Sequence, residues 1–336
     1  MATIRDVARE SGVSIATVSR VFNHGSIVRR DTRDKVIAAA ERLGYWPGAV
    51  AGKPVESRTH AVGVLLPAPY GEFFSELVHG IDLAARTLGL HLLVSRSTST
   101  AVELGAALRL MRGRVDALVV VAPQPEAWAE LRSGADPVPM VRLHGSDAPP
   151  DCDTIEVANH EGARAVVLHL ATIGHRPIAM ITGPRHSADA RQRLDGFRSA
   201  LREAGHEADP RLEVAGDFTE SSGHEAATRL FARDPRPAAV FAANDYMAIG
   251  AMRAARGAGL RLPDDLAIAG FDDIPLARAV SPPLTTVSVD FRHMGRRAIE
   301  LLAEAWRGGA RPPSRHEVLP AALVVRGSCG AAVVAR

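Results

Sequence analysis

From residue 61 onward, short continuous apolar runs alternate with longer segments that have the periodicity of helices. The apolar runs fall at 61–66, 90–95, 117–121 and 138–143, and again at 178–181, 239–241 and 266–269. The helical segments fall at 74–88, 102–112, 160–173, 191–204 and 245–258. Apolar strands between helices are typical of parallel sheets that are covered on both faces. Two such series predict an α/β chain with two doubly wound lobes, in which ligands bind at the carboxyl ends of the strands.

The first 45 residues follow a different pattern, which predicts three short helices. Thr3 precedes the first helix and has Asp6 three residues further on, the spacing of a capping box. Gly12 ends this helix and Ser14 caps the next one, so the connection between the two is a tight turn. A third helix is expected from Thr32 to Leu43. The pattern is that of a helix-turn-helix domain.

The second of these helices has the properties of a helix that reads DNA. Its apolar stripe, Val18 and Val21, faces inward. Ile15, Ala16 and Arg20 on the opposite side are therefore free to enter a major groove. An arginine binds guanine through two hydrogen bonds, and small apolar side chains contact the methyl group of thymine. The alternative is a small helical domain that contacts another protein.

Charge is distributed unevenly along the 336 residues, a length that suits two or three domains. Residues 1–59 contain ten Lys and Arg against six Asp and Glu, and the remaining residues contain 30 against 32. A basic module joined to a nearly neutral body is typical of a protein whose first part binds the phosphate backbone of nucleic acid. The sequence has no apolar run of about 18 residues, no secretory signal and only two cysteines, which are expected to be free. A cytoplasmic protein without membrane contact is expected.

Several short motifs in the first 47 residues occur together. They are Asp6-Val7-Ala8, Gly12-Val13-Ser14 and Ala16-Thr17-Val18-Ser19-Arg20-Val21, followed by Thr32-Arg33-Asp34-Lys35-Val36, Leu43-Gly44-Tyr45 and Pro47. This run resembles the headpiece of the lactose-repressor (LacI/GalR) family of bacterial transcription regulators. The resemblance implies an N-terminal three-helix DNA-binding domain followed by a two-lobed α/β effector domain like that of periplasmic binding proteins. The expected boundaries are 1–45 for the headpiece, 46–59 for a hinge linker, 60–158 with 291–322 for the N-terminal lobe, and 159–290 with 323–336 for the C-terminal lobe.

The expected hinge departs from the pattern of the family, which is roughly Pro-Asn-Ala-Val-Ala-Arg-Ser-Leu. Gly48 stands in place of the asparagine that caps the hinge helix, Gly52 in place of the arginine, and Pro54 in place of the leucine that wedges into the minor groove. Glycine weakens a helix by about 1 kcal/mol and proline by about 3 kcal/mol at an interior position. We therefore expect a weaker or shorter hinge helix, in which Pro54 can still act as an apolar wedge. The expected DNA-contacting residues are Thr3, Ser14, Ile15, Ala16, Thr17, Ser19, Arg20, Asn23, Arg29 and Pro54.

Residues near predicted strand ends match effector-binding positions of the family. Arg193 matches the effector-binding arginine, and Asp272 matches a carboxylate that binds hydroxyl groups, so the two are expected to hold a diol from two sides. The full expected effector site comprises Phe73, His144, Arg193, Phe218, Asn244 and Asp272. The alternatives are a surface arginine, a turn aspartate and core phenylalanines. His144 stands where many sugar-binding members have an aspartate, which leaves open a ligand other than a neutral hexose.

The sequence lacks the motifs of the common enzyme classes. It has no Gly-x-Ser-x-Gly elbow, no phosphate loop, no His-Glu-x-x-His and no Gly-x-Gly-x-x-Gly after a strand. His160 and His169 are about 2.5 turns apart on one helix and face opposite sides, so they are not expected to share a metal ion. No catalytic residue, metal or cofactor is expected.

The expectation that follows is a transcription repressor that binds a pseudo-palindromic operator in double-stranded DNA as a homodimer. A small-molecule effector, a sugar or sugar derivative, is expected to control it from the cleft between the lobes. The first alternative is a regulator of the same fold that answers to a protein co-repressor or to no effector. A solute-binding protein is disfavoured by the added helix-turn-helix, and a sugar-metabolising enzyme comes last.

Overall fold

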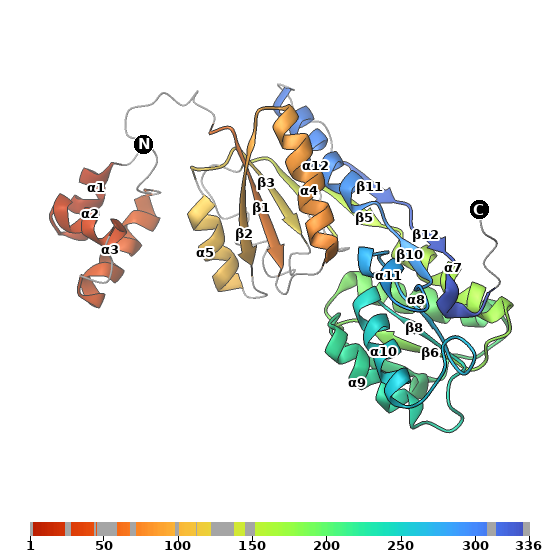
Figure 1. The fold of residues 1–336 in the computed structure, drawn as a ribbon. Helices are drawn as coiled ribbons and strands as arrows, with labels where there is room; N and C mark the ends of the chain where they lie inside the picture. Colours follow the sequence, from red (N-terminus) through yellow and green to blue (C-terminus); the bar gives the residue numbers. More distant parts are fainter. Residues whose placement is uncertain are drawn as a thin grey trace. The chain divides into compact units, whose positions relative to one another are not determined.

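The structure is a computed structural model that describes residues 3–23, 28–43, 45, 59–67, 72–97, 101–111, 113–121, 138–144, 152–307 and 314–331 (Figure 1). The chain forms two compact units. The first comprises Met1–Ala68, Arg86–Val119 and Gln124–Pro139, and the second comprises Pro69–Ala85, Val120–Pro123 and Met140–Arg336. None of the helices in the described ranges is both long enough and apolar enough to cross a membrane.

The N-terminal helices are α1 (Ile4–Ser11), α2 (Ile15–Asn23) and α3 (Arg30–Leu43). The predicted capping box is present, because the backbone N–H of Thr3 donates to the carboxylate of Asp6 and the Thr3 hydroxyl accepts from the backbone of Asp6. Gly12 ends α1 with φ 68°, a left-handed conformation that costs glycine little. The third helix begins at Arg30, two residues before the predicted start, because helix ends are poorly defined by periodicity alone.

A small core joins these three helices. The buried residues are Val7, Ala8, Val18, Val21, Val36, Ala39 and Ala40. Phe22 and Tyr45 pack edge to face at its margin, with ring centroids 6.1 Å apart. The predicted inward stripe of α2 is therefore confirmed, and the opposite side of α2 is left for other contacts.

The larger sheet has six strands in the order β11-β5-β4-β3-β1-β2. Its strands are β1 (Ala61–Pro67), β2 (His91–Ser97), β3 (Ala117–Val121), β4 (Met140–Leu143), β5 (Asp153–Val157) and β11 (His316–Leu319). The β1–β2, β4–β5 and β5–β11 pairs are parallel. The helices of this region are α4 (Glu72–Thr87), α5 (Ala101–Met111) and α12 (Phe291–Arg307). Burial of β1 and β3 along nearly their whole lengths explains their continuous apolar sequence.

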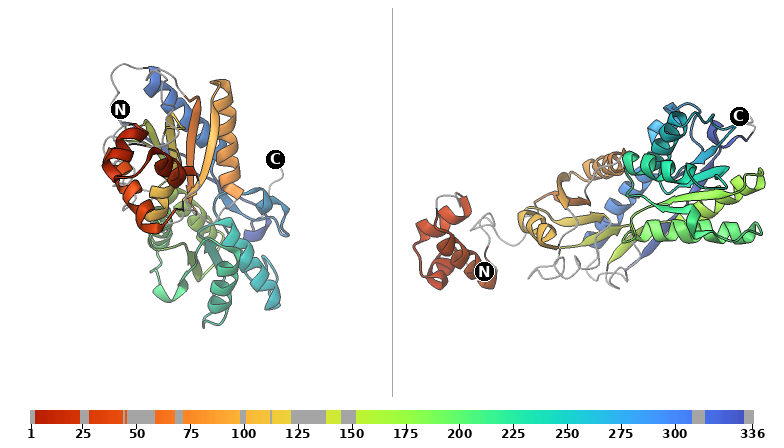
Figure 2. Two further views of the ribbon diagram at one scale, coloured as in Figure 1. Left: turned by 90° about the vertical axis from the view of Figure 1, so that its left-hand side faces the viewer. Right: turned by 90° about the horizontal axis from the view of Figure 1, so that it is seen from below.

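The smaller sheet has the order β7-β6-β8-β9, and its printed pairs are all parallel. Its strands are β6 (Ile178–Thr182), β7 (Glu213–Ala215), β8 (Ala239–Ala242) and β9 (Ala267–Ala269). Its helices are α7 (Asn159–Thr172), α8 (Ala188–Glu203), α9 (Glu220–Phe231), α10 (Asp245–Gly257) and α11 (Pro275–Ala279). Helices α7 and α8 pack together on one face, and α9 and α10 pack together on the other (Figure 2). This is the doubly wound arrangement that the alternation predicts.

The chain passes between the two sheets more than once. Strand β5 of the larger sheet is followed after one residue by α7 of the smaller one. The chain returns through β10 (Thr286–Ser288) and α12 to β11, and then continues into β12 (Ala322–Val324), which pairs antiparallel with β10. The predicted lobe boundaries remain a proposal, because the compact units divide the chain differently.

Some elements escaped the sequence analysis. Strand β5 was not predicted because Asp153, Thr154 and Glu156 interrupt its apolar pattern. All five of its residues are nevertheless buried, and Arg142 on the neighbouring strand donates to Glu156 at 2.9 Å. A polar residue in a central strand is tolerated when a partner of this kind satisfies it. Strand β7 and helices α9, α11 and α12 were also not predicted.

Candidate functional site

One face of α2 carries the residues that were expected to meet DNA bases. Ile15 is 45% exposed, and Ala16 and Arg20 are exposed as well. A large apolar side chain exposed beside an arginine at the start of a helix suits base edges in a major groove. The structure therefore places these three side chains as the sequence predicts.

The other expected DNA-contacting residues lie around this face with different roles. The hydroxyl of Ser14 accepts from the backbone N–H of Thr17 at 3.2 Å and lies 2.9 Å from the Thr17 hydroxyl, so both side chains help to begin α2. Thr3 begins α1 in the same way, and Ser19 is half-buried. Arg29 is exposed just before α3. The side chain of Asn23, residue Pro54 and the whole predicted hinge helix lie outside the described residues.

The second candidate site is built around Arg193 on α8. Its side chain is 5% exposed, which rules out a surface arginine. Nε donates to Oδ1 of Asn159 at 2.9 Å, and Nη1 donates to the carbonyl oxygen of Ala243 at 2.5 Å. Nη1 also lies 3.1 Å from Oδ1 of Asp272, and the guanidinium lies 3.7 Å from the centroid of the Phe271 ring. The structure thus joins Arg193 and Asp272, as expected from the sequence.

Asp272 follows β9 and continues the edge of the smaller sheet. Its backbone N–H donates to the carbonyl of Val287 at 2.8 Å, and it forms a parallel bridge with Ser288. Burial raises the pKa of its carboxyl to about 6, while the neighbouring Arg193 and His144 act in the opposite direction. A buried carboxylate beside a fixed guanidinium can accept from one hydroxyl of a ligand while the guanidinium donates to the next one.

Backbone strain gathers at the expected effector residues. Five described residues other than glycine have a positive φ, and three of them are His144 (63°), Phe218 (70°) and Asp272 (107°). Such conformations cost about 1 to 3 kcal/mol and cluster at ligand sites, because the surrounding structure must hold them. Three of the six effector residues expected from the sequence are thus among the five described residues other than glycine that have a positive φ. This coincidence supports a functional site at these residues.

Asn244 and Phe218 support each other. The side-chain oxygen of Asn244 accepts from the backbone N–H of Met247 at 3.0 Å and caps α10. Its amide nitrogen donates to the carbonyl of Phe218 at 3.0 Å. The Phe218 ring packs so closely on Gly183 that no Cβ would fit there. Asn244 therefore holds the loop of Phe218, in addition to any contact with a ligand.

His144 lies at the end of β4 and is 4% exposed. Its Nδ1 is 2.8 Å from Oδ2 of Asp189 on α8, so the pair links an element of the larger sheet with a helix of the smaller one. The His144 ring lies 6.1 Å from that of Phe291. The side chain of Phe73, the remaining expected residue, lies outside the described side chains.

Three residues of this site were not foreseen, namely Asn159, Asp189 and Gln192. Asn159 binds Arg193, and its amide nitrogen donates to Oε1 of Gln192 at 3.1 Å. The signal for Asn159 was available, because it lies two residues after the end of a strand, but that strand was itself missed. Gln192 and Asp189 lie in the run before Arg193, where only Arg193 was singled out.

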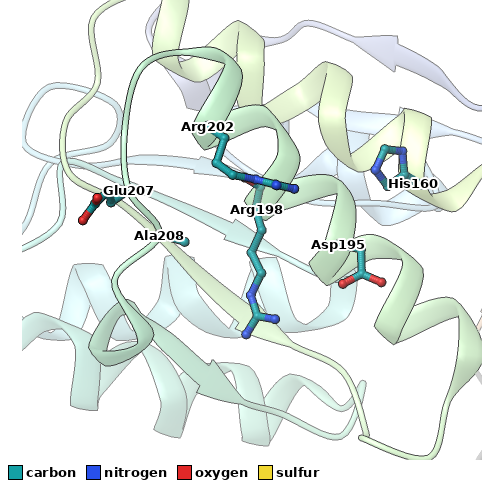
Figure 3. Close-up of a pocket in the computed structure, with 6 residues that line it drawn as sticks. All are labelled: His160, Asp195, Arg198, Arg202, Glu207 and Ala208. Carbon is teal, nitrogen blue, oxygen red and sulfur yellow. The ribbon is translucent and has the colours of Figure 1, made fainter.

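A hollow of about 540 Å³ opens away from this site on the smaller lobe, the name used here for the smaller sheet and the helices α7 to α11 that cover it. The hollow lies over α7, α8 and the loop after α8 (Figure 3). It is lined by His160, Asp195, Arg198, Arg202, Glu207 and Ala208. Arg198 is bound to both carboxylate oxygens of Glu213, at 2.8 and 2.6 Å. No expected effector residue lines it, and its mixed charges favour no single ligand. Within the described ranges, no cluster of three or more His, Cys, Asp or Glu could hold a metal ion.

Two known families match the chain. Residues 3–48 match the bacterial regulatory proteins of the lacI family, and residues 167–329 match a periplasmic binding protein-like domain. The ribose operon repressor of Escherichia coli (strain K12) is 35% identical over 330 residues, which cover 98% of this chain and 100% of that protein. The HTH-type transcriptional repressor PurR of Photobacterium profundum is 35% identical over 306 residues, 90% of this chain and 92% of that protein.

Two solved structures of transcription regulators are similar to nearly the whole chain. The transcriptional regulator CelR in its cellobiose complex has a TM-score of 0.75 and 31% identity, covering 98% of this chain and 100% of that one. The Lac repressor dimer bound to operator and the anti-inducer ONPF has a TM-score of 0.74 and 34% identity, with 98% and 99% coverage.

A helix-turn-helix headpiece joined to a periplasmic-binding-protein-like fold defines a DNA-binding transcription regulator with a ligand-binding domain. The chain belongs to the lacI family of bacterial regulatory proteins. The expected family, fold class and function, a DNA-binding repressor that acts as a dimer under the control of a small molecule, are thereby confirmed. The two relatives named above are transcription repressors.

Proposed function

We propose that this chain represses transcription by binding a pseudo-palindromic operator as a homodimer, and that a polyhydroxylated small molecule bound at Arg193 and Asp272 controls it. The observation that carries the proposal is the buried pair of Arg193 on α8 and Asp272 just after β9, in which Asp272 has a strained backbone. The chain acts by binding, with no catalytic step.

The headpiece supplies the contacts to DNA. Arg20 binds guanine in the major groove, and Ile15 and Ala16 contact thymine methyl groups. A single headpiece with so few base contacts is weakly selective, whereas two linked headpieces gain from their high effective concentration. Leu93 and Val94 on the edge strand β2 and Leu110 on α5 are exposed in the first unit, and a second copy of the chain would cover them.

The chemistry of the second site favours vicinal hydroxyl groups. Arg193 donates, Asp272 accepts, and His144 with Asp189 adds a second pair of polar groups close to them. The Phe218 ring supplies an apolar surface beside Gly183. Sugars combine hydroxyl groups with apolar C–H faces, so they fit such a site. CelR was solved with cellobiose, which is consistent with a sugar ligand for this fold.

A second candidate is a regulator of the same fold that answers to a protein co-repressor or to no effector. It is favoured by the internal pairing of the site, since Arg193 and Asp272 already satisfy each other. A ligand must then compete with contacts that the chain makes by itself.

The two candidates are separated by a thermal unfolding screen of the full chain against sugars, sugar phosphates and purines. A ligand at a hundred times its dissociation constant adds about 2.7 kcal/mol to the free energy of unfolding. We expect a hit among the sugars that is lost in Asp272→Asn. Stabilisation that survives in Asp272→Asn would contradict the proposed site, and no hit in the whole panel would favour the second candidate.

A further inference from the structure

Arg193 reaches its position only through neighbours that hold it. An arginine side chain has many rotamers, and ordering it on ligand binding would cost affinity. Here the Phe271 ring, the Ala243 carbonyl and the Asn159 side chain fix it beforehand. Of these three, only Asn159 acts through a side-chain hydrogen bond to Nε.

Asn159 is itself held in one orientation. It is 1% exposed, and its amide nitrogen donates to Oε1 of Gln192 at 3.1 Å. This contact turns the side-chain oxygen of Asn159 toward Arg193, where it accepts from Nε at 2.9 Å. The reverse orientation would place two donors against each other, so the network specifies one geometry.

The contact between Asn159 and Arg193 lies where the chain crosses from one sheet to the other. Asn159 is the first residue of α7 and lies two residues after the end of β5, where the chain leaves the larger sheet for the smaller one. The backbone N–H of Ala158 donates to the carbonyl of Leu319 at the end of β11, at 2.9 Å. Two crossing segments are thus bonded together next to Asn159, and a rotation of the backbone there would move the oxygen that holds Arg193.

We propose that Asn159 is the positioning residue of the effector site, which holds Arg193 against Asp272 and makes this arrangement depend on the backbone of the β5–α7 crossing. The inference rests on the proposed function for the role of the site, but the geometry it describes exists without ligand. Loss of the Asn159 oxygen frees the guanidinium to move away from Asp272.

The test uses the titration of Asp272, which does not require a ligand. The charged or titratable groups that act on Asp272 are Arg193 and Asp189 from α8, His144 from the end of β4, and Asp245 from α10. Because the guanidinium lowers the pKa of Asp272, its displacement must raise that pKa. Asn159→Ser replaces the amide oxygen that accepts from Nε by a hydroxyl on a side chain one atom shorter, which withdraws the acceptor from the guanidinium. We expect the midpoint to move upward by about half a unit or more from the wild-type value of about 6.

The measurement is the free energy of urea unfolding of the full chain from pH 4 to pH 8. Subtraction of the same curve for an added Asp272→Asn change gives the contribution of Asp272 together with its electrostatic coupling to Asp245. Gln192→Met, which removes only the partner that orients Asn159, should give a smaller shift in the same direction. It also serves as a second variant if Asn159→Ser folds poorly.

The matched control is Ser328→Ala, which removes a buried hydroxyl bonded to the backbone of Thr285 and Ile268. It should lower stability without moving the midpoint, because it has no contact with Arg193. An Asn159→Ser chain that loses stability but keeps the wild-type midpoint would overturn the proposal, since Asn159 would then be merely structural.

Isothermal titration calorimetry with D-ribose and cellobiose measures ligand affinity directly and so separates this inference from the proposed function. A sugar that binds the wild-type chain should bind Asn159→Ser about tenfold more weakly, because Arg193 is no longer ordered beforehand. Equal affinity would overturn the positioning role. If neither sugar binds the wild-type chain, ribose and cellobiose fail as effectors, while the titration still decides the role of Asn159.

Discussion

At the scale of single residues, polar side chains pair in the interior at the second site and on the neighbouring strands β4 and β5. Arg193 meets Asp272, His144 meets Asp189, and Arg142 meets Glu156. Pairs of this kind contribute little net stability, because each charge loses its hydration. Arg142 satisfies the buried Glu156 within the sheet, whereas the Arg193–Asp272 and His144–Asp189 pairs are better explained by recognition of a polar ligand than by stabilisation of the fold.

Asp272 should make the stability of the chain depend on pH. Burial raises its pKa from 3.8 to about 6, so the folded chain binds a proton more tightly than the unfolded chain between these values. Stability is therefore fully retained below about pH 4 and falls as pH rises to about 6, by about 3 kcal/mol from this group. Asp272→Asn should remove this part of the curve in urea unfolding.

The control for this prediction is Asp264→Asn, an exposed carboxylate whose side chain is 65% accessible. It should leave the shape of the curve unchanged. Asp245 is also buried, and burial together with the nearby Asp272 holds its pKa well above the usual range. Asp272→Asn should therefore also lower the pKa of Asp245, and the difference curve reports Asp272 together with its coupling to Asp245. A difference curve that stays flat from pH 4 to pH 6 would show that Asp272 does not titrate as described.

At the scale of secondary structure, glycines let the helices of the smaller lobe cross closely. A Cβ at Gly250 on α10 would meet the carbonyl oxygen of Glu220 and, at 2.7 Å, the backbone nitrogen of His224 on α9. Both are backbone atoms, which cannot move aside as a side chain can. The crossing of α9 and α10 therefore depends on the missing side chain at this position.

Gly250→Ala should destabilise the chain by about 1 to 3 kcal/mol through overpacking. Gly257→Ala on the same helix is the matched control, because nothing lies within 4 Å of a Cβ there. The control should be neutral or stabilise the chain by a few tenths of a kcal/mol, since alanine is the better helix former. Equal effects of the two changes in thermal unfolding would contradict this account of the crossing.

The helices and strands that could be predicted from the sequence have regular apolar patterns, whereas a strand that was missed has buried polar residues. The periodic pattern located α4, α7, α8 and α10 to within a few residues and β1, β3 and β6 almost fully, because their apolar residues follow one face or one buried run. It missed β5, whose polar residues are buried against partners from distant parts of the chain. Pairing of that kind is a tertiary property and leaves no local pattern.

The same distinction holds for the candidate site. Arg193 could be predicted from the resemblance to the family, and Asp272 from that resemblance and from its place after a strand. Asn159 was missed together with the strand that precedes it, and Asp189 could not be predicted, because its importance lies in a contact with His144 that only the fold creates. Left-handed backbone at His144, Phe218 and Asp272 was likewise invisible, since none of these residues is glycine.

At the scale of the whole molecule, binding of DNA and binding of a small molecule must be coupled through differences in free energy. A coupling of about 1 to 3 kcal/mol, which is typical of allosteric proteins, changes operator affinity about 5- to 150-fold. The β5–α7 crossing, where Asn159 holds Arg193, is one described place where an effector could act on the chain outside the smaller lobe.

The DNA-reading role of α2 can be tested with an operator selected from random DNA by the wild-type chain. Arg20→Ala should weaken operator binding by about 1 to 3 kcal/mol per contact and relax the preference at one base pair in each half-site. Arg211→Ala removes an equal charge from an exposed position in the second unit and should change neither. Uniform weakening without loss of sequence preference would assign Arg20 to phosphate instead.

The central claim is that a small molecule bound at Arg193 and Asp272 controls operator binding. The measurement that tests it most directly is the operator affinity of the full chain, by fluorescence anisotropy, with and without the compound that stabilises it in the thermal screen. We predict a change of at least about fivefold in the wild-type chain. In Asp272→Asn, we predict the same operator affinity as in the ligand-free wild-type chain and no response to the compound. An equal response in both chains, or none in the wild type, would contradict the account.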